Sequence, residues 1–119
     1  MIHDAGDWLS ASEARAQVAS RIAEGELTTW LVSSDGRMLG LVSNRVRAMV
    51  VLMTGEGDAG EHAVDETAIG SSNGFVLDNG QVDEYPNQDT VPVDVALRVV
   101  SSVVQHGTPP PDIGWRVDR

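Results

Sequence analysis

The sequence contains no cysteine, no lysine and no long apolar run. Without cysteine, the chain can form neither a disulfide framework nor a thiolate metal site. Its longest apolar stretch, Ala48 to Met53, is far too short to span a bilayer. The first residues also lack the basic segment and apolar run of a secretory signal. We therefore expect a cytoplasmic protein with no membrane partner.

Length and composition indicate a single folded domain that extends over residues 1–119. Apolar residues make up 41% of the chain, which favours a globule with one core over a disordered chain.

The charge of the chain is strongly one-sided. Eighteen acidic residues accompany eight basic ones, all arginine, which gives a formal net charge of −10. The segment from Ala48 to Leu97 contains ten of the acids and no arginine, whereas the rest of the chain is balanced. Such a charge repels phosphate backbones and disfavours direct nucleic-acid binding. Two interpretations remain open: a solubilising surface, or a surface complementary to a basic protein partner.

Two amphipathic helices are predicted. Ser10 and Glu13 have the spacing of a capping box, and the apolar positions behind them predict a helix from Ala11 to Glu24 that stops at Gly25. A second helix is expected with Pro92 in its first turn, ending at Gly107. Its apolar stripe consists of Val93, Ala96, Leu97, Val100, Val103 and Val104.

Most of the remaining chain has the pattern of strands. The dipeptide Asp35-Gly36 predicts a hairpin turn between Leu27–Ser33 and Arg37–Ser43. The following run, Arg45 to Thr54, is apolar on both faces from Met49 to Met53, which predicts a central strand covered on both sides.

Further strands are expected in the second half of the chain. Asn79-Gly80 predicts a second hairpin between Phe75–Asp78 and Gln81–Tyr85. Shorter strands are expected at Glu61–Glu66 and Ile113–Val117. We therefore predict an α+β fold, in which a mainly antiparallel sheet of about five to seven strands carries two amphipathic helices.

The sequence contains no complete catalytic or cofactor-binding motif. Gly70-x-Ser72-x-Gly74 has the pattern of a nucleophile elbow, but a β-prone run follows it where the elbow requires a helix. Glu61-His62 has no second histidine at helical spacing, and the glycines precede no phosphate-binding helix. We expect no catalytic residue, no metal and no cofactor.

The aromatic residues are few, and their roles are predicted as follows. Trp8, Trp30 and Trp115 are interpreted as core or staple residues. Tyr85 lies beside two acids at the end of the second hairpin, which suits either a protein interface or a half-buried strand position. On charge and position, the candidate partner-binding residues are Asp78, Asp83, Glu84, Tyr85 and Asp89.

The segment Gly74–Pro86 resembles the signature of the first-numbered immunity-protein family of bacterial polymorphic toxin systems, which occurs in actinobacteria and related bacteria. Shorter pieces on either side agree with this resemblance: Glu61–Asp65, Val91-Pro92 with Ala96-Leu97, and Gly107 with Pro110 and Trp115. The similarity covers roughly Leu41 to Arg119 and leaves the first forty residues unconstrained.

The resemblance implies a protein without catalytic activity that neutralises a cognate toxin in the producing cell. Toxins paired with this family often resemble nucleic-acid deaminases, some acting on cytosine in DNA, and such enzymes present a basic groove to their substrate. An acidic inhibitor would cover that groove. Two alternatives stay open at this point: an acidic regulatory or scaffolding domain, and a small ligand-binding or hydrolytic enzyme that uses Ser72 or His62.

Overall fold

The computed structural model of the chain describes residues 2–3 and 8–119. The elements of the first half are β1 (Ile2–His3), α1 (Ala11–Ala23), β2 (Thr28–Val32), β3 (Met38–Ser43), β4 (Arg47–Met53) and β5 (Glu61–Val64). Those of the second half are β6 (Ser71–Val76), β7 (Val82–Pro86), the 3-10 turn η1 (Asn87–Asp89), β8 (Val91–Pro92), α2 (Val93–His106) and β9 (Gly114–Val117).

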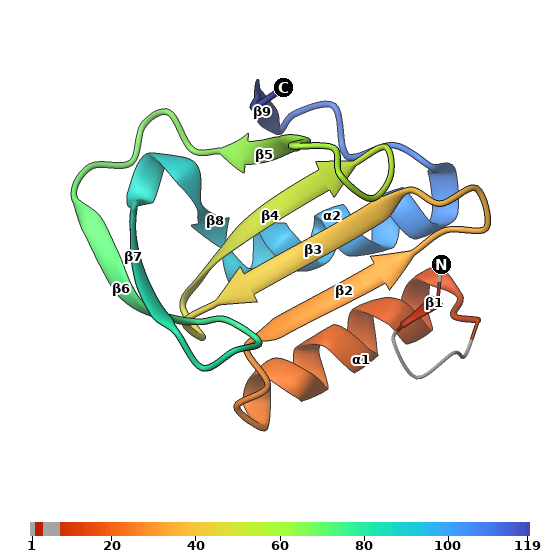
Figure 1. Ribbon diagram of the computed structural model, residues 1–119, viewed down its shortest axis with the longest axis horizontal. Coiled ribbons are helices and arrows are strands. Elements are labelled where there is room, and N and C mark those ends of the chain that lie inside the picture. The colour runs from red at the N-terminus through yellow and green to blue at the C-terminus, as the bar shows by residue number, and fades with distance from the viewer. Residues whose placement is uncertain (1, 4–7) are drawn as a thin grey trace.

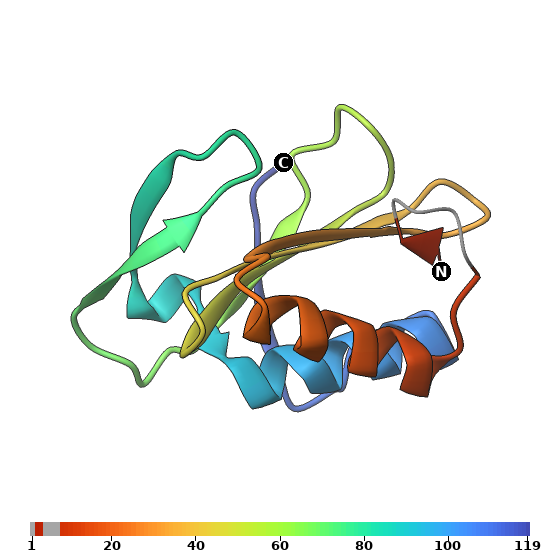
Figure 2. The same ribbon diagram turned by 90° about the horizontal axis from the view of Figure 1, so that it is seen from below.

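The described residues form a seven-stranded antiparallel sheet in the order β1-β2-β3-β4-β5-β9, with β8 paired to the start of β4. Both helices lie side by side against one face of this sheet (Figures 1 and 2). Strands β6 and β7 form a separate hairpin at one end. The prediction of an α+β fold with a mainly antiparallel sheet and two helices is confirmed.

The helix boundaries follow from the local signals in the sequence. Both hydrogen bonds of the predicted capping box are present at the start of α1, since Ser10 Oγ accepts from the backbone N–H of Glu13 and the Glu13 carboxylate accepts from that of Ser10. The prediction that Pro92 lies in the first turn of α2 is wrong, because Pro92 is extended, pairs with Arg47 in β8 and precedes the helix. Helix α2 ends before Gly107, whose φ of 78° is the left-handed conformation that glycine adopts readily.

The hydrophobic core lies between the sheet and the helices. Leu31, Leu39, Leu41 and Val50 point from neighbouring strands toward the helices and are at most 1% exposed. They meet the buried stripes of the two helices: Ala14, Val18 and Ile22 from α1, and Ala96, Val99, Val100 and Val103 from α2. Trp115 packs against this core, as predicted. Trp8 is 62% exposed, so of its two predicted roles the core position is wrong.

The β6–β7 hairpin is confirmed around Asn79-Gly80, but β6 begins at Ser71 instead of Phe75. The chain expected as a loop pairs with β7 because an irregularity between Ser72 and Phe75 absorbs the extra residues there. Gly74, with φ of 84°, permits this bulge. The bend brings the hairpin against the sheet, where the ring of Phe75 is completely buried.

Arg47 joins β4 to the chain segment that returns from the hairpin. Its guanidinium donates to Asp65 Oδ2 at 2.8 Å, to Thr90 Oγ1 at 2.7 Å and to the carbonyl oxygens of Asn87 and Thr90. The Arg47 hydrogen bond is the main reason that the pKa of Asp65 lies below its usual range. This cluster fixes the position of η1 and β8 against the sheet.

Candidate partner-binding face

The face of the sheet that turns away from the helices is apolar and partly exposed. In β4, Ala48 and Val50 are buried beneath the helices, whereas Met49, Val51 and Met53 alternate with them and are partly exposed. The strand register then places nine positions on this face, which we call the open face: Thr28, Trp30, Val32, Met38, Gly40, Val42, Met49, Val51 and Met53.

An antiparallel sheet with one solvated face ordinarily carries polar residues there, but threonine is the only polar residue type among these nine positions, and the charged side chains of this face (Arg47, His62 and Arg116) lie outside them. The prediction that Met49 to Met53 is covered on both sides is therefore wrong. The helices cover one side of the sheet, and the β6–β7 hairpin reaches over one end of the other (Figure 2). The sequence pattern is apolar on both faces, and on the second face the described residues leave Met49, Val51 and Met53 partly exposed.

Trp30 lies flat across the middle of the open face. A Cβ atom built at Gly40, the residue paired with Trp30 on β3, would lie 2.4 to 2.7 Å from three carbons of the indole ring. Only the absence of a side chain at Gly40 allows this close approach. The indole is thereby held down as part of a continuous apolar floor.

Two hollows lie at opposite ends of the open face. One, of about 260 Å³, is formed by Thr28, Trp30 and Val42 together with the hairpin turn Leu77–Asn79. The other, of about 480 Å³, lies between Val32, Met38 and the loops that follow β2 and β4. The β6–β7 hairpin and the β4–β5 loop both rise on the side of the sheet away from the helices (Figure 2). The open face is therefore the floor of a shallow trough with raised ends.

A charged cluster closes one long side of this trough. His62 is paired with Val51 across β4 and β5 and is 8% exposed. Its Nδ1 lies 2.7 Å from Asp118 Oδ2 and its Nε2 lies 3.0 Å from Asp89 Oδ1, which also accepts from Arg116 at 3.0 Å. Two carboxylate acceptors require both ring nitrogens to carry protons. Burial lowers the pKa of His62, but the two carboxylates outweigh burial and raise it above its ordinary value of 6.5.

The structure divides the acidic residues into paired and unpaired groups. Within the acid-rich segment, Asp58, Glu61, Asp65 and Asp89 are ion-paired to arginines that come from outside it, namely Arg47, Arg116 and Arg119. Six acids of the segment form no ion pair with any described residue: Glu56, Glu66, Asp78, Asp83, Glu84 and Asp94. Of these six, Asp78 borders the first hollow and Glu56 borders the second.

The five predicted partner-binding residues do not form one patch. Asp78 is exposed at the hairpin turn, and Asp89 is engaged by His62 and Arg116. Glu84 is exposed, whereas its neighbours Asp83 and Tyr85 are partly buried, as alternation along β7 requires.

Tyr85 has mainly internal contacts. Its ring packs against Phe75 with centroids 4.9 Å apart, and its hydroxyl donates to Asp83 Oδ2 at 2.8 Å. Burial, reinforced by the charge and hydrogen bond of Asp83, raises the pKa of Tyr85 to about 12. Tyr85 therefore stays neutral at every physiological pH and serves to hold Phe75 in the hairpin.

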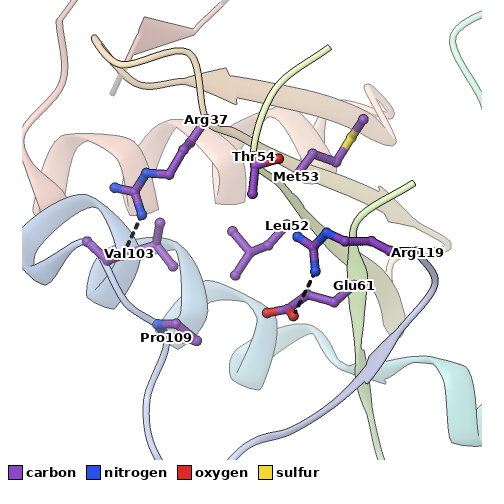
Figure 3. A pocket seen from close by; sticks show the side chains of 9 residues that line it. Arg37, Leu52, Met53, Thr54, Glu61, Val103, Pro109 and Arg119 are labelled. Carbon is purple, nitrogen blue, oxygen red and sulfur yellow. Dashed lines mark hydrogen bonds and ion pairs between the residues drawn. The ribbon is translucent and has the colours of Figure 1, made fainter. Parts of the chain in front are cut away.

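A smaller hollow, of about 190 Å³, lies between the end of β4 and the C-terminal end of α2 (Figure 3). Leu52 and Val103 form its apolar wall, with Arg37 and Arg119 on opposite sides. Arg37 Nη1 donates to the carbonyl oxygen of Gly107 at 2.8 Å, and Arg119 pairs with carboxylates of the neighbouring loop and strand. Arg37 therefore caps the C-terminal end of α2, and Arg119 is already paired with carboxylates. We interpret this hollow as part of the helix-capping contacts and not as a candidate binding site.

Ser72 and His62, the residues of the hydrolase alternative, have other partners. The Ser72 hydroxyl donates to Asn87 Oδ1. Both His62 ring nitrogens lie against carboxylates, which leaves neither nitrogen free to accept a serine proton. Among the described residues, no group of three or more histidine and acidic side chains is arranged to hold a metal ion.

Sequence reasoning missed the residues of the open face as candidate site residues. Trp30 was interpreted as a core or staple residue, and Met38, Met49 and Met53 were not proposed as site residues. A signal was present, because β4 is apolar at both alternating positions. What the pattern could not reveal is that the described part of the chain leaves those methionines partly exposed.

Comparison of the chain with protein-family models, with curated proteins and with solved structures finds no match. The resemblance to the immunity-protein family therefore stays a prediction. Neither α1 nor α2, nor any other described helix, has the length and apolarity needed to cross a bilayer.

Proposed function

We propose that this chain is an immunity protein, which binds a cognate bacterial toxin in the cytoplasm of the producing cell and blocks it without chemistry of its own. The observation that carries the proposal is the open face: an apolar sheet surface that contains Trp30 and three methionines and lies between raised acidic ends. Aromatic residues and methionine are enriched at protein interfaces, and contiguous apolar surfaces of this kind are typical of binding sites.

The net charge of −10 supports a basic partner. Opposed potentials accelerate the encounter of two proteins and select against partners of the same sign. A toxin that acts on nucleic acid has to present a basic surface to phosphates. An acidic protein seated on that surface excludes the substrate by occupying its place and by repelling its charge.

Co-expression with the toxin gene is the experiment that tests this function. We expect the chain to restore growth of cells that express the adjacent toxin domain, and to copurify with it. An unrelated acidic protein of similar size and charge is the control for a purely electrostatic effect. Undiminished killing in the presence of the chain would refute the proposal, whereas copurification without rescue of growth would favour a scaffolding role.

A further inference from the structure

We infer that the open face is where the partner binds, and that it receives a segment in which one large apolar side chain lies between two basic residues. This inference rests on the proposed function and names the surface and the partner chemistry that the function would use. It depends on three features of the trough: its apolar floor, its flattened indole and its two unpaired acids.

The floor favours an apolar anchor. Trp30 lies against Gly40 and so leaves a flat surface at the centre, next to Val51 on β4. The methionines on either side have flexible, polarisable side chains that adapt to different apolar shapes. Seating one aromatic or long aliphatic residue there buries area on both partners, and such residues dominate the energy of protein interfaces.

The ends of the trough favour basic residues. Asp78 and Glu56 border the two hollows, and neither is ion-paired with a described residue. Thr28 and Val32, near the two ends of β2, are four residues apart, which corresponds to about 14 Å along a strand. A partner segment of that length can therefore place one arginine or lysine at each end while its central side chain rests on the floor.

The same charges argue against other occupants. A second copy of the chain would bring Asp78 and Glu56 against like charges, on a molecule whose net charge is already −10. A nucleic acid would bring phosphates against the same carboxylates. A basic protein segment is the occupant that both the apolar floor and the acidic ends of the trough favour.

Methionine oxidation tests this surface without any substitution. Met38, Met49 and Met53 all lie on the open face, and dilute peroxide converts accessible thioethers to sulfoxides. We expect the oxidation of these three residues, measured by mass spectrometry, to slow at least five-fold in the complex with a catalytically inactive toxin domain. An unrelated basic protein at the same concentration should give no protection. A complex in which all three oxidise at the free rate would overturn the inference and leave the proposed function standing.

Two pairs of variants provide an independent test. Val51→Lys places a charge on the floor, and we expect it to weaken binding to the toxin domain at least 100-fold. Its matched control is Val117→Lys on the opposite face of the sheet, where Val117 is 59% exposed, and we expect a change below three-fold.

If circular dichroism shows that Val51→Lys does not fold, charge reversal at the two ends of the trough provides the test instead. Asp78→Lys combined with Glu56→Lys alters only exposed side chains, and we expect at least ten-fold weaker binding. The control is Glu24→Lys combined with Asp94→Lys, which reverses the same number of charges at exposed positions of the two helices. Equal losses in the double variant and the control would refute the assigned surface. No complex and no rescue by the unmodified chain would instead refute the proposed function itself.

Discussion

The contact between Trp30 and Gly40 makes a quantitative prediction about the stability of the open face. In a strand interior, replacing glycine by alanine ordinarily gains about 0.5–1 kcal/mol, because glycine loses more backbone entropy on folding. At Gly40 the new methyl group would lie as close as 2.4 Å to the indole ring, so Trp30 has to lift from the sheet.

The expected cost follows from the area that the indole loses. Lifting a partly exposed tryptophan uncovers on the order of 100 Å² of apolar surface, which corresponds to about 2.5 kcal/mol at about 25 cal/mol per Å². After the backbone gain is subtracted, Gly40→Ala should lower the free energy of unfolding by about 1.5–2 kcal/mol. In a Trp30→Ala background the clash is absent, and the same substitution should be neutral or stabilising by about 0.5 kcal/mol.

Urea unfolding followed by far-ultraviolet circular dichroism measures all four proteins of this double-mutant cycle without relying on the tryptophan signal. We expect a coupling free energy of about 2 kcal/mol between the two positions. If Gly40→Ala had the same effect in both backgrounds, within the roughly 0.5 kcal/mol expected of independent sites, the indole would not be held against Gly40 and the flat floor would be refuted.

Three further predictions concern the charged and aromatic clusters around the trough. Arg47→Met should lower the free energy of unfolding by about 2–3 kcal/mol in urea titrations. The reason is that it leaves Asp65 without its main partner at a site where both side chains are largely buried. An effect below about 0.5 kcal/mol would show that the Arg47 hydrogen bonds do not stabilise the fold. The raised pKa of His62 means that its contribution to stability is fully present below about pH 6.5, the unfolded value, and is lost as pH rises through the folded pKa. The stability difference between the unmodified chain and His62→Gln should therefore shrink from pH 6 toward alkaline pH, and a difference that grows would reverse the sign of the argument. Tyr85 is the only tyrosine, so absorbance at 295 nm reports it alone; we expect little phenolate below pH 11 in the folded chain, with a pKa near 12, and Asp83→Asn should lower that pKa only partly, since burial is its larger cause.

Elements whose determinants lie within a few residues were predictable from the sequence. The capping box at Ser10 needs only Glu13, the end of α2 needs only Gly107, and the turn after β6 needs only Asn79-Gly80. By contrast, β8 and η1 are fixed by Arg47, which lies at least forty residues earlier in the chain, and no local pattern indicates that contact. The start of β6 was misplaced because a bulge hides the alternation that identifies strands.

The candidate site depended still more on distant contacts. The sequence of the acid-rich segment allowed a solubilising surface or a surface complementary to a basic partner, but it did not show that arginines from β4 and from the C-terminal end of the chain neutralise part of the segment. Asp89 in particular is an internal partner of His62 and Arg116. Composition determines the total charge, whereas only the fold determines which acids remain unpaired.

The apolar open face and the large negative charge of the chain can be explained together. A partly exposed apolar surface that contains tryptophan and methionine would by itself promote self-association, because burial of apolar area is not selective for a partner. A net charge of −10 opposes the approach of a second copy and favours a basic protein. If this coupling is correct, neutralising the rim through Asp78→Asn and Glu56→Gln should increase self-association at low ionic strength while it weakens binding to a basic partner. Analytical ultracentrifugation compares that double variant with Glu24→Gln combined with Asp94→Asn, which also removes two charges but at exposed positions of the helices. If the acids serve solubility in general, both double variants should show the same change, whereas our explanation predicts a larger change for the trough variant.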